Sequence, residues 1–399
     1  MTKDMNVPGP IRIGIVAGET SGDLLGAGLM RELTKRVGPV AFEGIGGPRM
    51  QAQGCVSLYP MEQLSLIGFE AVRKYRSILA IRRALVERFS AAPPDLFIGV
   101  DVPDFNLVLE ERLRAAGVPT VHYVSPTVWA WRGYRLRRIK RAVDRMLTLF
   151  PFEAKYYETH GVPVTFVGHP LADQIPDDYD PAEYRDLLNL PRERTLVALL
   201  PGSRINELYR HADLFVQTAQ WLHRRQPTMH FVAPFVNLET RALFEAALDR
   251  QGARDVPLTL LTGHSREALA ASDVALLASG TATLEAALLR KLMVVTYKVS
   301  ALSALLIRLF SHVKLYSLPN NLAGRALVPE LLQDDAVPEK LGAAVEYYLA
   351  HRRHAESVMQ EMRAMHAALR QDADVRAAQA VAEMLRVRFP QLTQRAVSG

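Results

Sequence analysis

Asp101 is the residue of this sequence best placed to move a proton. It directly follows the apolar run Leu96–Val100, which has the form of a buried strand. A carboxylate at that point is costly unless it reaches solvent, a partner or a substrate. In a binding cleft it could act as a general base toward a hydroxyl group. Because Asp104 is better placed to cap the helix that follows, Asp101 is left as the catalytic candidate.

A glycine-rich turn after the first apolar run could bring a ligand close to the backbone. The segment Gly18–Asp23 opens a helix but matches neither the G-x-G-x-x-G pattern nor a P-loop. We expect a functional role for Ser21 and Gly22. For Gly26 and Gly28, close packing of the helix is an equally good reason for glycine.

Two loops in the second half could bind a nucleotide. In Pro201–Arg204, backbone N–H groups and a guanidinium could hold a diphosphate without a metal. Ala278–Thr283 opens another helix with small residues, and Glu285 lies one turn further on. A glutamate there can accept hydrogen bonds from both ribose hydroxyls. Together the loops predict a nucleotide site.

Composition excludes several classes of protein. The chain has 399 residues, 49% of them hydrophobic and 23% charged, which is typical of a folded protein of about two domains. One cysteine, and 11 histidines without ligand spacing, predict no disulfide scaffold, no metal site and no cofactor. We see no secretory signal and no apolar run long enough to span a bilayer, so we expect a soluble or peripheral protein.

The elements that must position these residues alternate between strand and helix. Apolar runs such as Ile11–Ala17 and Leu196–Leu200 are separated by helix-length segments, which predicts parallel sheets covered on both faces. We expect an α/β protein with two Rossmann-like domains facing each other across a cleft. Residues 1–175 would form the first domain and 185–345 the second, with helices in 346–399 packing back on the first.

The formal net charge of +6 leaves nucleic acid, an anionic membrane surface or phosphorylated substrates open as partners. Cations are densest in Trp131–Arg145 and in Ile67–Arg88, where they alternate with apolar residues. Such a pattern suits a segment at a membrane surface. A core-facing helix with a solvated basic face fits it equally well.

Eight phrases of the sequence resemble the lipid A disaccharide synthase family, over about residues 11–385. They are Val16–Asp23, Gly47–Met50, Asp101–Asn106, His122–Pro126, Val128–Arg132, Leu200–Arg204, Ala278–Ala282 and Ser317–Asn320. The resemblance implies an inverting, metal-independent hexosyltransferase with the two-domain GT-B fold. Its reaction would join UDP-2,3-diacylglucosamine to 2,3-diacylglucosamine 1-phosphate and release UDP and a β-1,6-linked disaccharide 1-phosphate.

The resemblance also assigns roles to individual residues. Asp101 matches the proposed general base of the family, and Arg204, Glu285 and Asn320 match UDP-binding positions. The residues expected around UDP are Gly202, Ser203, Arg204, Ser279, Gly280, Thr281, Glu285 and Asn320. Those expected on the acceptor side are Glu19, Ser21, Gly22, Tyr123 and Ser125.

The family acts at the cytoplasmic face of the inner membrane, and this implies a peripheral location there. The residues expected to contact the membrane are Ile67, Phe69, Val72, Arg73, Lys74, Ile78 and Leu79. The phosphorylated substrates and an anionic membrane are therefore the expected partners, without nucleic acid. The path of the terminal helices leaves a homodimer open.

Two alternatives come from different classes of protein. A non-hydrolysing UDP-N-acetylglucosamine 2-epimerase has the same two-half architecture and a UDP site, but it needs no surface for acyl chains. An RNA-binding module could use the basic cluster Trp131–Arg145 and would bind with strong salt dependence. The second alternative gives no role to Asp101 or to the nucleotide-type loops.

Overall fold

Uninterrupted apolar runs form the central strands of two parallel sheets. All five residues of Leu96–Val100, Leu196–Leu200 and Val274–Ala278 are buried, as strands covered on both faces require. The structure, a computed structural model, describes residues 10–64, 71–128, 135–299 and 315–390, without the side chains of residues 71–75.

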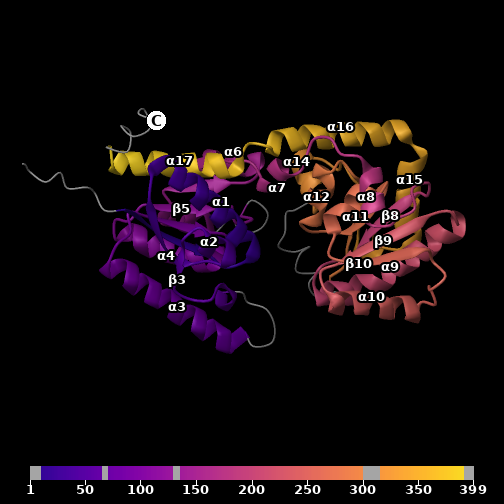
Figure 1. Cartoon of the computed structure of the whole chain (residues 1–399), viewed down its shortest axis with the longest axis horizontal. Helices are drawn as coiled ribbons and strands as arrows, with labels where there is room; N and C mark the ends of the chain where they lie inside the picture. The colour runs from indigo at the N-terminus through magenta and orange to yellow at the C-terminus, as the bar shows by residue number, and fades with distance from the viewer. Residues whose placement is uncertain (1–9, 65–70, 129–134, 300–314, 391–399) are drawn as a thin grey trace, which may run out of the picture. The chain divides into compact units, whose positions relative to one another are not determined.

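The chain divides into two units, which we call the first and second unit. The first comprises Met1–Asp173 and Leu369–Gly399, and the second comprises Gln174–Ala368. Each unit contains one parallel sheet flanked by helices (Figure 1). The expected pair of Rossmann-like α/β units with terminal helices is therefore confirmed.

The first unit has a seven-stranded sheet in the order β3-β2-β1-β4-β5-β6-β7. Its strands are β1 (Ile11–Ala17), β2 (Val40–Ile45), β3 (Val56–Ser57), β4 (Leu96–Val100), β5 (Thr120–Tyr123), β6 (Arg145–Thr148) and β7 (Val164–Phe166). Its helices are α1 (Thr20–Val37), α2 (Pro48–Ala52), α3 (Ala71–Ala91), α4 (Pro103–Ala115), α5 (Leu136–Ala142), α6 (Pro151–Thr159) and α17 (Ala373–Arg388), with the 3-10 helix η1 (Met61–Leu64). Helix α7 (Pro170–Gln174) lies at the boundary with the second unit.

The second unit has a six-stranded sheet in the order β10-β9-β8-β11-β12-β13. Its strands are β8 (Leu196–Leu200), β9 (His230–Phe235), β10 (Leu258–Thr262), β11 (Val274–Ala278), β12 (Leu292–Tyr297) and β13 (Glu330–Leu332). Its helices are α8 (Pro181–Leu187), α9 (Ile205–Arg225), α10 (Leu238–Arg250), α11 (Ser265–Ala271), α12 (Ala282–Leu288), α14 (Leu318–Ala323), α15 (Pro338–Ala350) and α16 (Arg352–Leu369), with the 3-10 helix η3 (Gln333–Asp335).

Opposite faces of the first sheet are buried by different helices. Ile13 and Ile15 of β1 lie in one apolar cluster with residues of α1 and α17. Val16, the next residue along the strand, lies in another cluster with Phe105 and Leu109 of α4. The alternation along β1 is that of a strand buried on both sides.

The terminal helices divide between the two units, which corrects the expected limit at residue 346. Helix α15 and nearly all of α16 belong to the second unit, and only the chain from Leu369 onward belongs to the first. Helix α17 packs along α1, so the yellow end of the chain lies beside its indigo beginning (Figure 1). The side chains of Arg31 and Asp374 form an ion pair of 3.0 Å across this contact.

His169 holds the returning chain against the first unit. Its backbone N–H donates to the Leu369 carbonyl at 2.9 Å, and its Nδ1 accepts from the Leu171 N–H at 3.1 Å. The ring lies 5.6 Å from that of Phe150. Burial of the ring lowers the pKa of His169 from 6.5 to about 4, because the charged form is desolvated.

Acid should therefore destabilise the first unit through His169. The unfolded chain binds a proton near pH 6.5 and the folded chain only near pH 4, so stability falls as the pH drops between these values. We expect this group to contribute a slope of about 1.4 kcal/mol per pH unit, measurable by urea unfolding at several pH values. His169→Gln should remove that contribution, whereas His160→Gln, at an exposed site of the same unit, should not. Equal slopes in wild type and His169→Gln would contradict this role of the buried ring.

Candidate active site

The backbone at Asp101 is held in a conformation that few residues adopt. Asp101 has a φ of 54° and Val102 a φ of 44°, both in the left-handed region. This region is unfavourable for a β-branched residue, and such strain persists only where the surroundings enforce it. The Asp101 N–H donates to the Tyr123 carbonyl at 2.8 Å, which ties the end of β4 to the end of β5.

The side chain of Asn106 fixes this turn through hydrogen bonds to backbone carbonyl groups. Asn106 is fully buried on α4, and its Nδ2 lies 2.8 Å from the Asp101 carbonyl and 3.2 Å from the Val16 carbonyl. One amide therefore connects the ends of β1 and β4. These strands are neighbours in the sheet although helices and two further strands separate them in sequence, so they flank the topological switch point where ligands bind in such folds.

The Asp101 carboxylate is left available for a ligand. The residue is partly exposed, and among the described residues its carboxylate has no hydrogen-bond or ion-pair partner. Gly18, just after β1, leaves space for the side chain of Val102, because a Cβ at position 18 would lie 2.6 Å from Cγ2 of Val102. A free carboxylate at this edge can accept a proton from a hydroxyl group bound beside it.

Asp104 does not cap α4 with its side chain, contrary to expectation. The N-cap position is Val102, and Asp104 lies in the first turn, where its carboxylate forms an ion pair with Arg135. Asp104 is therefore paired, whereas Asp101 has no partner among the described residues.

The glycine-rich turn is built into the fold through Asp23. This carboxylate is buried and accepts hydrogen bonds from the N–H groups of Arg49 and Met50, both at 3.0 Å. It thereby closes the N-terminus of α2. The segments Val16–Asp23 and Gly47–Met50, which both carry the family resemblance, are thus in direct contact.

Within the same turn, exposure separates functional candidates from packing residues. Glu19 and Ser21 are exposed at the start of α1, where a ligand can reach them. Gly22 is buried, and a Cβ there would lie 3.3 Å from that of Ala17. At Gly26 and Gly28 a Cβ would meet the Met50 sulfur at 2.7 Å and the Asp374 carboxylate at 2.2 Å, so packing accounts for both glycines.

Tyr123 and Ser125 cannot present their side chains to an acceptor, which corrects their expected role. Tyr123 is fully buried in the apolar cluster of the first sheet, and burial raises its pKa. Ser125 is also buried, and its Oγ lies 3.0 Å from the Pro126 carbonyl, to which it donates, and 3.0 Å from the Tyr157 hydroxyl. Both residues shape the loop, and Tyr123 holds Asp101 through its carbonyl.

Sequence reasoning missed a buried, hydrogen-bonded pair of side chains behind β4, Glu110 and His122. Oε1 of Glu110 lies 2.8 Å from Nδ1 of His122, and both side chains are inaccessible to solvent. Desolvation raises the pKa of Glu110, while His122 opposes that rise. Gly99 is required here, since a Cβ would lie 2.1 Å from Oε1 of Glu110. A charged residue on the buried side of α4 was the available signal.

The segment expected at the membrane is only partly described. Ile67 and Phe69 lie outside the described residues, as do the side chains of Val72, Arg73 and Lys74. Ile78 is buried among residues such as Ile81 and Phe89, so it belongs to the core and is not a membrane contact. Leu79 is half-buried.

In the second unit, the equivalent switch point lies between β8 and β11. After β8, the Glu207 carboxylate accepts hydrogen bonds from the N–H groups of Ser203 and Arg204, at 2.9 and 3.2 Å. Gly202, with a φ of 133°, leaves room for it. The side chain of Arg204 is 82% exposed and pairs with Glu207 only at 3.3 Å. The guanidinium is therefore open to an anion, while the two amides already hold a carboxylate.

His211, another residue that sequence reasoning missed, fixes this loop. It is buried on α9, with Nδ1 at 2.9 Å from the Pro201 carbonyl and Nε2 at 2.9 Å from the Lys298 N–H. The neutral ring that donates from Nδ1 satisfies both partners. Desolvation lowers the pKa of His211, which favours this neutral form. The ring connects the carboxyl ends of β8 and β12.

The loop after β11 combines exposed amides with a held carboxylate. Gly280 and Thr281 are exposed, and among the described residues their N–H groups have no acceptor. The Ser279 hydroxyl donates to the Tyr316 carbonyl at 3.2 Å. One turn into α12, Oε1 of Glu285 is held by Arg266 at 2.8 Å, while Oε2 has no partner among the described residues. Arg266 had no sequence signal, because it comes from another helix.

Asn320 supports this region but cannot contact UDP, contrary to expectation. It is fully buried; its Nδ2 donates to the Val328 carbonyl and to Glu330, and its Oδ1 accepts from the Leu327 and Val328 N–H groups. Every hydrogen-bonding position of its amide is thus occupied. Glu330 also binds the N–H groups of Tyr316 and Ser317, at 2.9 and 2.7 Å. Together they hold the loop on which Ser279 rests.

Among the described residues, no three His, Cys, Asp or Glu side chains are grouped closely enough to hold a metal ion. Within the same part of the chain, no helix combines the length and apolar character needed to cross a membrane.

The fold resembles those of several solved structures. UDP-GlcNAc 2-epimerase from Neisseria meningitidis, bound to UDP-GlcNAc, has a TM-score of 0.62 at 11% identity, covering 94% of this chain and 99% of the epimerase chain. MurG from Acinetobacter baumannii has a TM-score of 0.53 at 14% identity, covering 94% of this chain and 99% of that chain. At such identities the likeness is one of fold.

Sequence similarity is much closer to one family. Lipid-A-disaccharide synthase of Hahella chejuensis is 50% identical over 379 residues, 94% of this chain and 95% of the relative. That of Dechloromonas aromatica is 50% identical over 377 residues, 94% of this chain and 99% of the relative. The family model described as Lipid-A-disaccharide synthetase matches residues 13–384. The chain therefore belongs to the lipid-A-disaccharide synthetase family.

Proposed function

We propose that this chain transfers a 2,3-diacylglucosamine unit from UDP to the 6-hydroxyl of 2,3-diacylglucosamine 1-phosphate. As a member of its family, the chain is a glycosyltransferase of lipid A biosynthesis. The observation that carries the proposal is the Asp101 carboxylate, which stands without a partner among the described residues at the switch point of the first sheet.

The reaction is a single displacement in which Asp101 is the general base. Its carboxylate accepts the proton of the acceptor 6-hydroxyl while that oxygen forms a bond to the anomeric carbon of the donor. The bond from the same carbon to the UDP oxygen breaks, and UDP leaves with the electron pair. Attack from the face opposite UDP inverts the configuration and gives the β-1,6 linkage.

The second unit would bind UDP and stabilise the charge that develops on the leaving diphosphate. Arg204 supplies an exposed guanidinium, and Gly280 and Thr281 supply exposed N–H groups, so the leaving group meets fixed donors. Oε2 of Glu285 is the available acceptor for ribose hydroxyls, because Arg266 holds only the other oxygen. These donors and acceptors suit the diphosphate and ribose of a nucleoside diphosphate, and membership of the family supports UDP as its identity.

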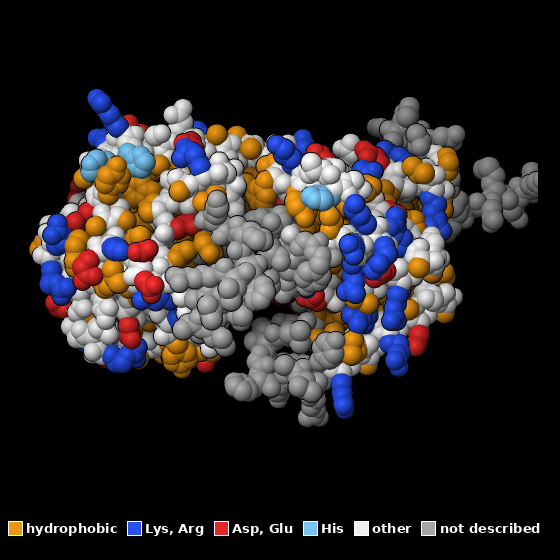
Figure 2. Space-filling model, turned by 180° about the vertical axis from the view of Figure 1, so that it is seen from behind, with side chains coloured by type: hydrophobic (Ala, Val, Ile, Leu, Met, Phe, Trp, Pro, Cys, Tyr) orange, Lys and Arg blue, Asp and Glu red, His pale blue; other side chains and the backbone are white. Residues whose placement is uncertain are grey.

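The first unit would also contact an anionic membrane from which the acylated acceptor comes. Lys and Arg side chains gather on one face of this unit (Figure 2). Exposed cations of α3 and α5 include Arg76, Arg83 and Lys140. We propose a peripheral position on the cytoplasmic face of the inner membrane, held by these cations and not by Ile78.

The epimerase alternative is supported by a likeness of fold alone, at 11% identity. Epimerisation would itself need a base, so Asp101 does not separate the two activities; the 50% sequence identity to lipid-A-disaccharide synthases favours the transferase. The synthase proposal accounts for the sites of both units.

Asp101→Asn should abolish most of the turnover while leaving UDP affinity unchanged. The amide keeps the shape of the side chain but cannot accept the hydroxyl proton, and loss of a general base costs roughly 10²–10⁴ in rate. UDP release from the two acylated sugars measures turnover, and calorimetry measures UDP binding.

Asp95→Asn is the matched control at the opposite end of the same strand. Asp95 precedes β4 and accepts from the Arg12 N–H at 2.8 Å, a bond that asparagine can keep. Its turnover should equal that of wild type. Near-normal turnover of Asp101→Asn would sink the assignment of the base.

Glu285→Gln should weaken UDP binding by removing the ribose acceptor. A hydrogen bond to a charged group contributes about 1.5–3 kcal/mol, so we expect a loss of roughly tenfold or more. Wild type should prefer UDP over 2′-deoxy-UDP, and the variant should lose most of that preference. Calorimetry with both nucleotides measures this directly.

Glu267→Gln provides the control on the neighbouring helix α11, where the carboxylate lies 3.8 Å from His264. It should leave both affinities unchanged. A Glu285→Gln variant that still discriminates between the two nucleotides would place the ribose elsewhere.

A further inference from the structure

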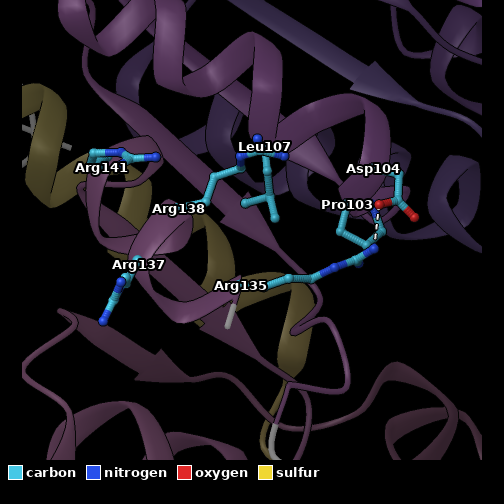
Figure 3. A pocket seen from close by; sticks show the side chains of 7 residues that line it. All are labelled: Pro103, Asp104, Leu107, Arg135, Arg137, Arg138 and Arg141. Atoms are coloured by element: carbon cyan, nitrogen blue, oxygen red, sulfur yellow. Dashed lines mark hydrogen bonds and ion pairs between the residues drawn. The ribbon is translucent and has the colours of Figure 1, made fainter. Parts of the chain in front are cut away.

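A cavity of about 350 Å³ lies beside the start of α4, where arginines converge. Leu107 and Asp104 of α4 line it together with Arg135, Arg137, Arg138 and Arg141. Figure 3 shows Arg135 reaching toward Asp104 and Arg138 extending to Leu107, with Arg137 and Arg141 further from Asp104. None of these arginines has a role in the displacement at Asp101.

The cavity carries more positive charge than the neighbouring carboxylates neutralise. Asp104 pairs with Arg135, and Glu111 is shared by Arg141 at 2.7 Å and Arg138 at 3.5 Å. Arg137 is exposed and has no ion-pair partner among the described residues. Two carboxylates thus face four guanidinium groups, which leaves an excess of donors for an anion.

Arg135 is already fixed in place for such a ligand. Its side chain is only 14% exposed, although Asp104, its partner, is 72% exposed. A held guanidinium presents its donors in a planar fork that matches phosphate oxygens, at a smaller loss of side-chain entropy than a free one. The other three arginines can close around an anion from solvent.

The cavity also lies close to the proposed catalytic base. Asp104 is three residues after Asp101, so their Cα atoms are separated by no more than about 11 Å. One sugar ring with its substituents bridges such a distance. A sugar that offers a hydroxyl to Asp101 can therefore place a charged group from its other end at the side of the cavity formed by Asp104 and Arg135.

We propose that this arginine cavity binds the phosphate monoester of the acceptor sugar and thereby orients its hydroxyl toward Asp101. The proposal rests on the proposed function for the identity of the acceptor, and it adds the site that recognises its phosphate. Phosphates of membrane lipids share this chemistry. The partly enclosed cavity, its apolar side at Leu107 and its position beside Asp101 favour the phosphate of the substrate.

Direct binding tests the cavity without requiring turnover. Glucosamine 1-phosphate is titrated with the full-length protein and followed by the broadening of its phosphorus NMR signal. Glucosamine, which lacks the phosphate, is then added as a competitor that should not displace it. Arg137→Gln and Arg138→Gln should each weaken binding of the phosphate by roughly tenfold. Arg112→Gln, which removes an exposed charge further along α4, should bind as wild type does.

Kinetics with two acceptors tests how the cavity is used. Acylated glucosamine with and without its 1-phosphate is compared at a fixed concentration of the UDP donor. Arg137→Gln should raise KM for the phosphorylated acceptor roughly tenfold with little change in kcat, and should leave the unphosphorylated acceptor unaffected. If wild type turns over neither acceptor, the proposed function fails while the binding result still stands.

Vesicles distinguish the two sources of phosphate. The variants are compared for sedimentation with vesicles of phosphatidylcholine containing phosphatidylglycerol. Unchanged binding of glucosamine 1-phosphate in both variants, or an equal loss in Arg112→Gln, would overturn the proposal. So would a loss of vesicle binding in Arg137→Gln and Arg138→Gln without a loss of sugar-phosphate binding, because the cavity would then serve lipid headgroups.

Discussion

The hydrogen bonds of the Asn106 carboxamide hold together the edge of the first sheet at which Asp101 lies. A parallel sheet leaves carbonyl groups unpaired where its strands end, and here one buried amide binds those of Val16 and Asp101. The left-handed backbone at Asp101 is tolerated because its carbonyl accepts from the Asn106 amide and its N–H donates to the Tyr123 carbonyl. Asp101 is partly exposed at this edge, where its carboxylate is available for the role that we propose.

In the second unit, different side chains bind the backbone groups at the strand ends. His211 connects the ends of β8 and β12, and Glu330 with Asn320 holds the loop beside β11. In each case a buried polar group with its hydrogen bonds satisfied shapes a loop whose exposed groups can bind the ligand. Residues that resemble ligand contacts in sequence can therefore belong to the supporting layer, as Asn320, Tyr123 and Ser125 do.

Sequence alone predicted the strands and the sheet type well, because a long apolar run between turn residues, such as Leu96–Val100, is typical of a strand buried on both faces. It also placed Asp101 and Arg204 correctly at strand ends. It could not tell which way Tyr123 points, since such a strand shows no alternation of polar and apolar residues. Contacts between distant segments, such as that of Arg266 with Glu285, left no local pattern. The edge strands β3 and β7 were missed because two or three residues are too few to show a period.

The return of α17 to the first unit gives the chain an unusual order of assembly during synthesis. The apolar face that α1 shares with Ala377, Val381 and Leu385 stays uncovered until α17 leaves the ribosome. The second unit, which is contiguous, is complete before then. At roughly 5–20 residues per second, the interval is on the order of tens of seconds. A ribosome that stops early would thus release a folded second unit joined to a first unit with an open apolar groove, a species that chaperones and proteases recognise.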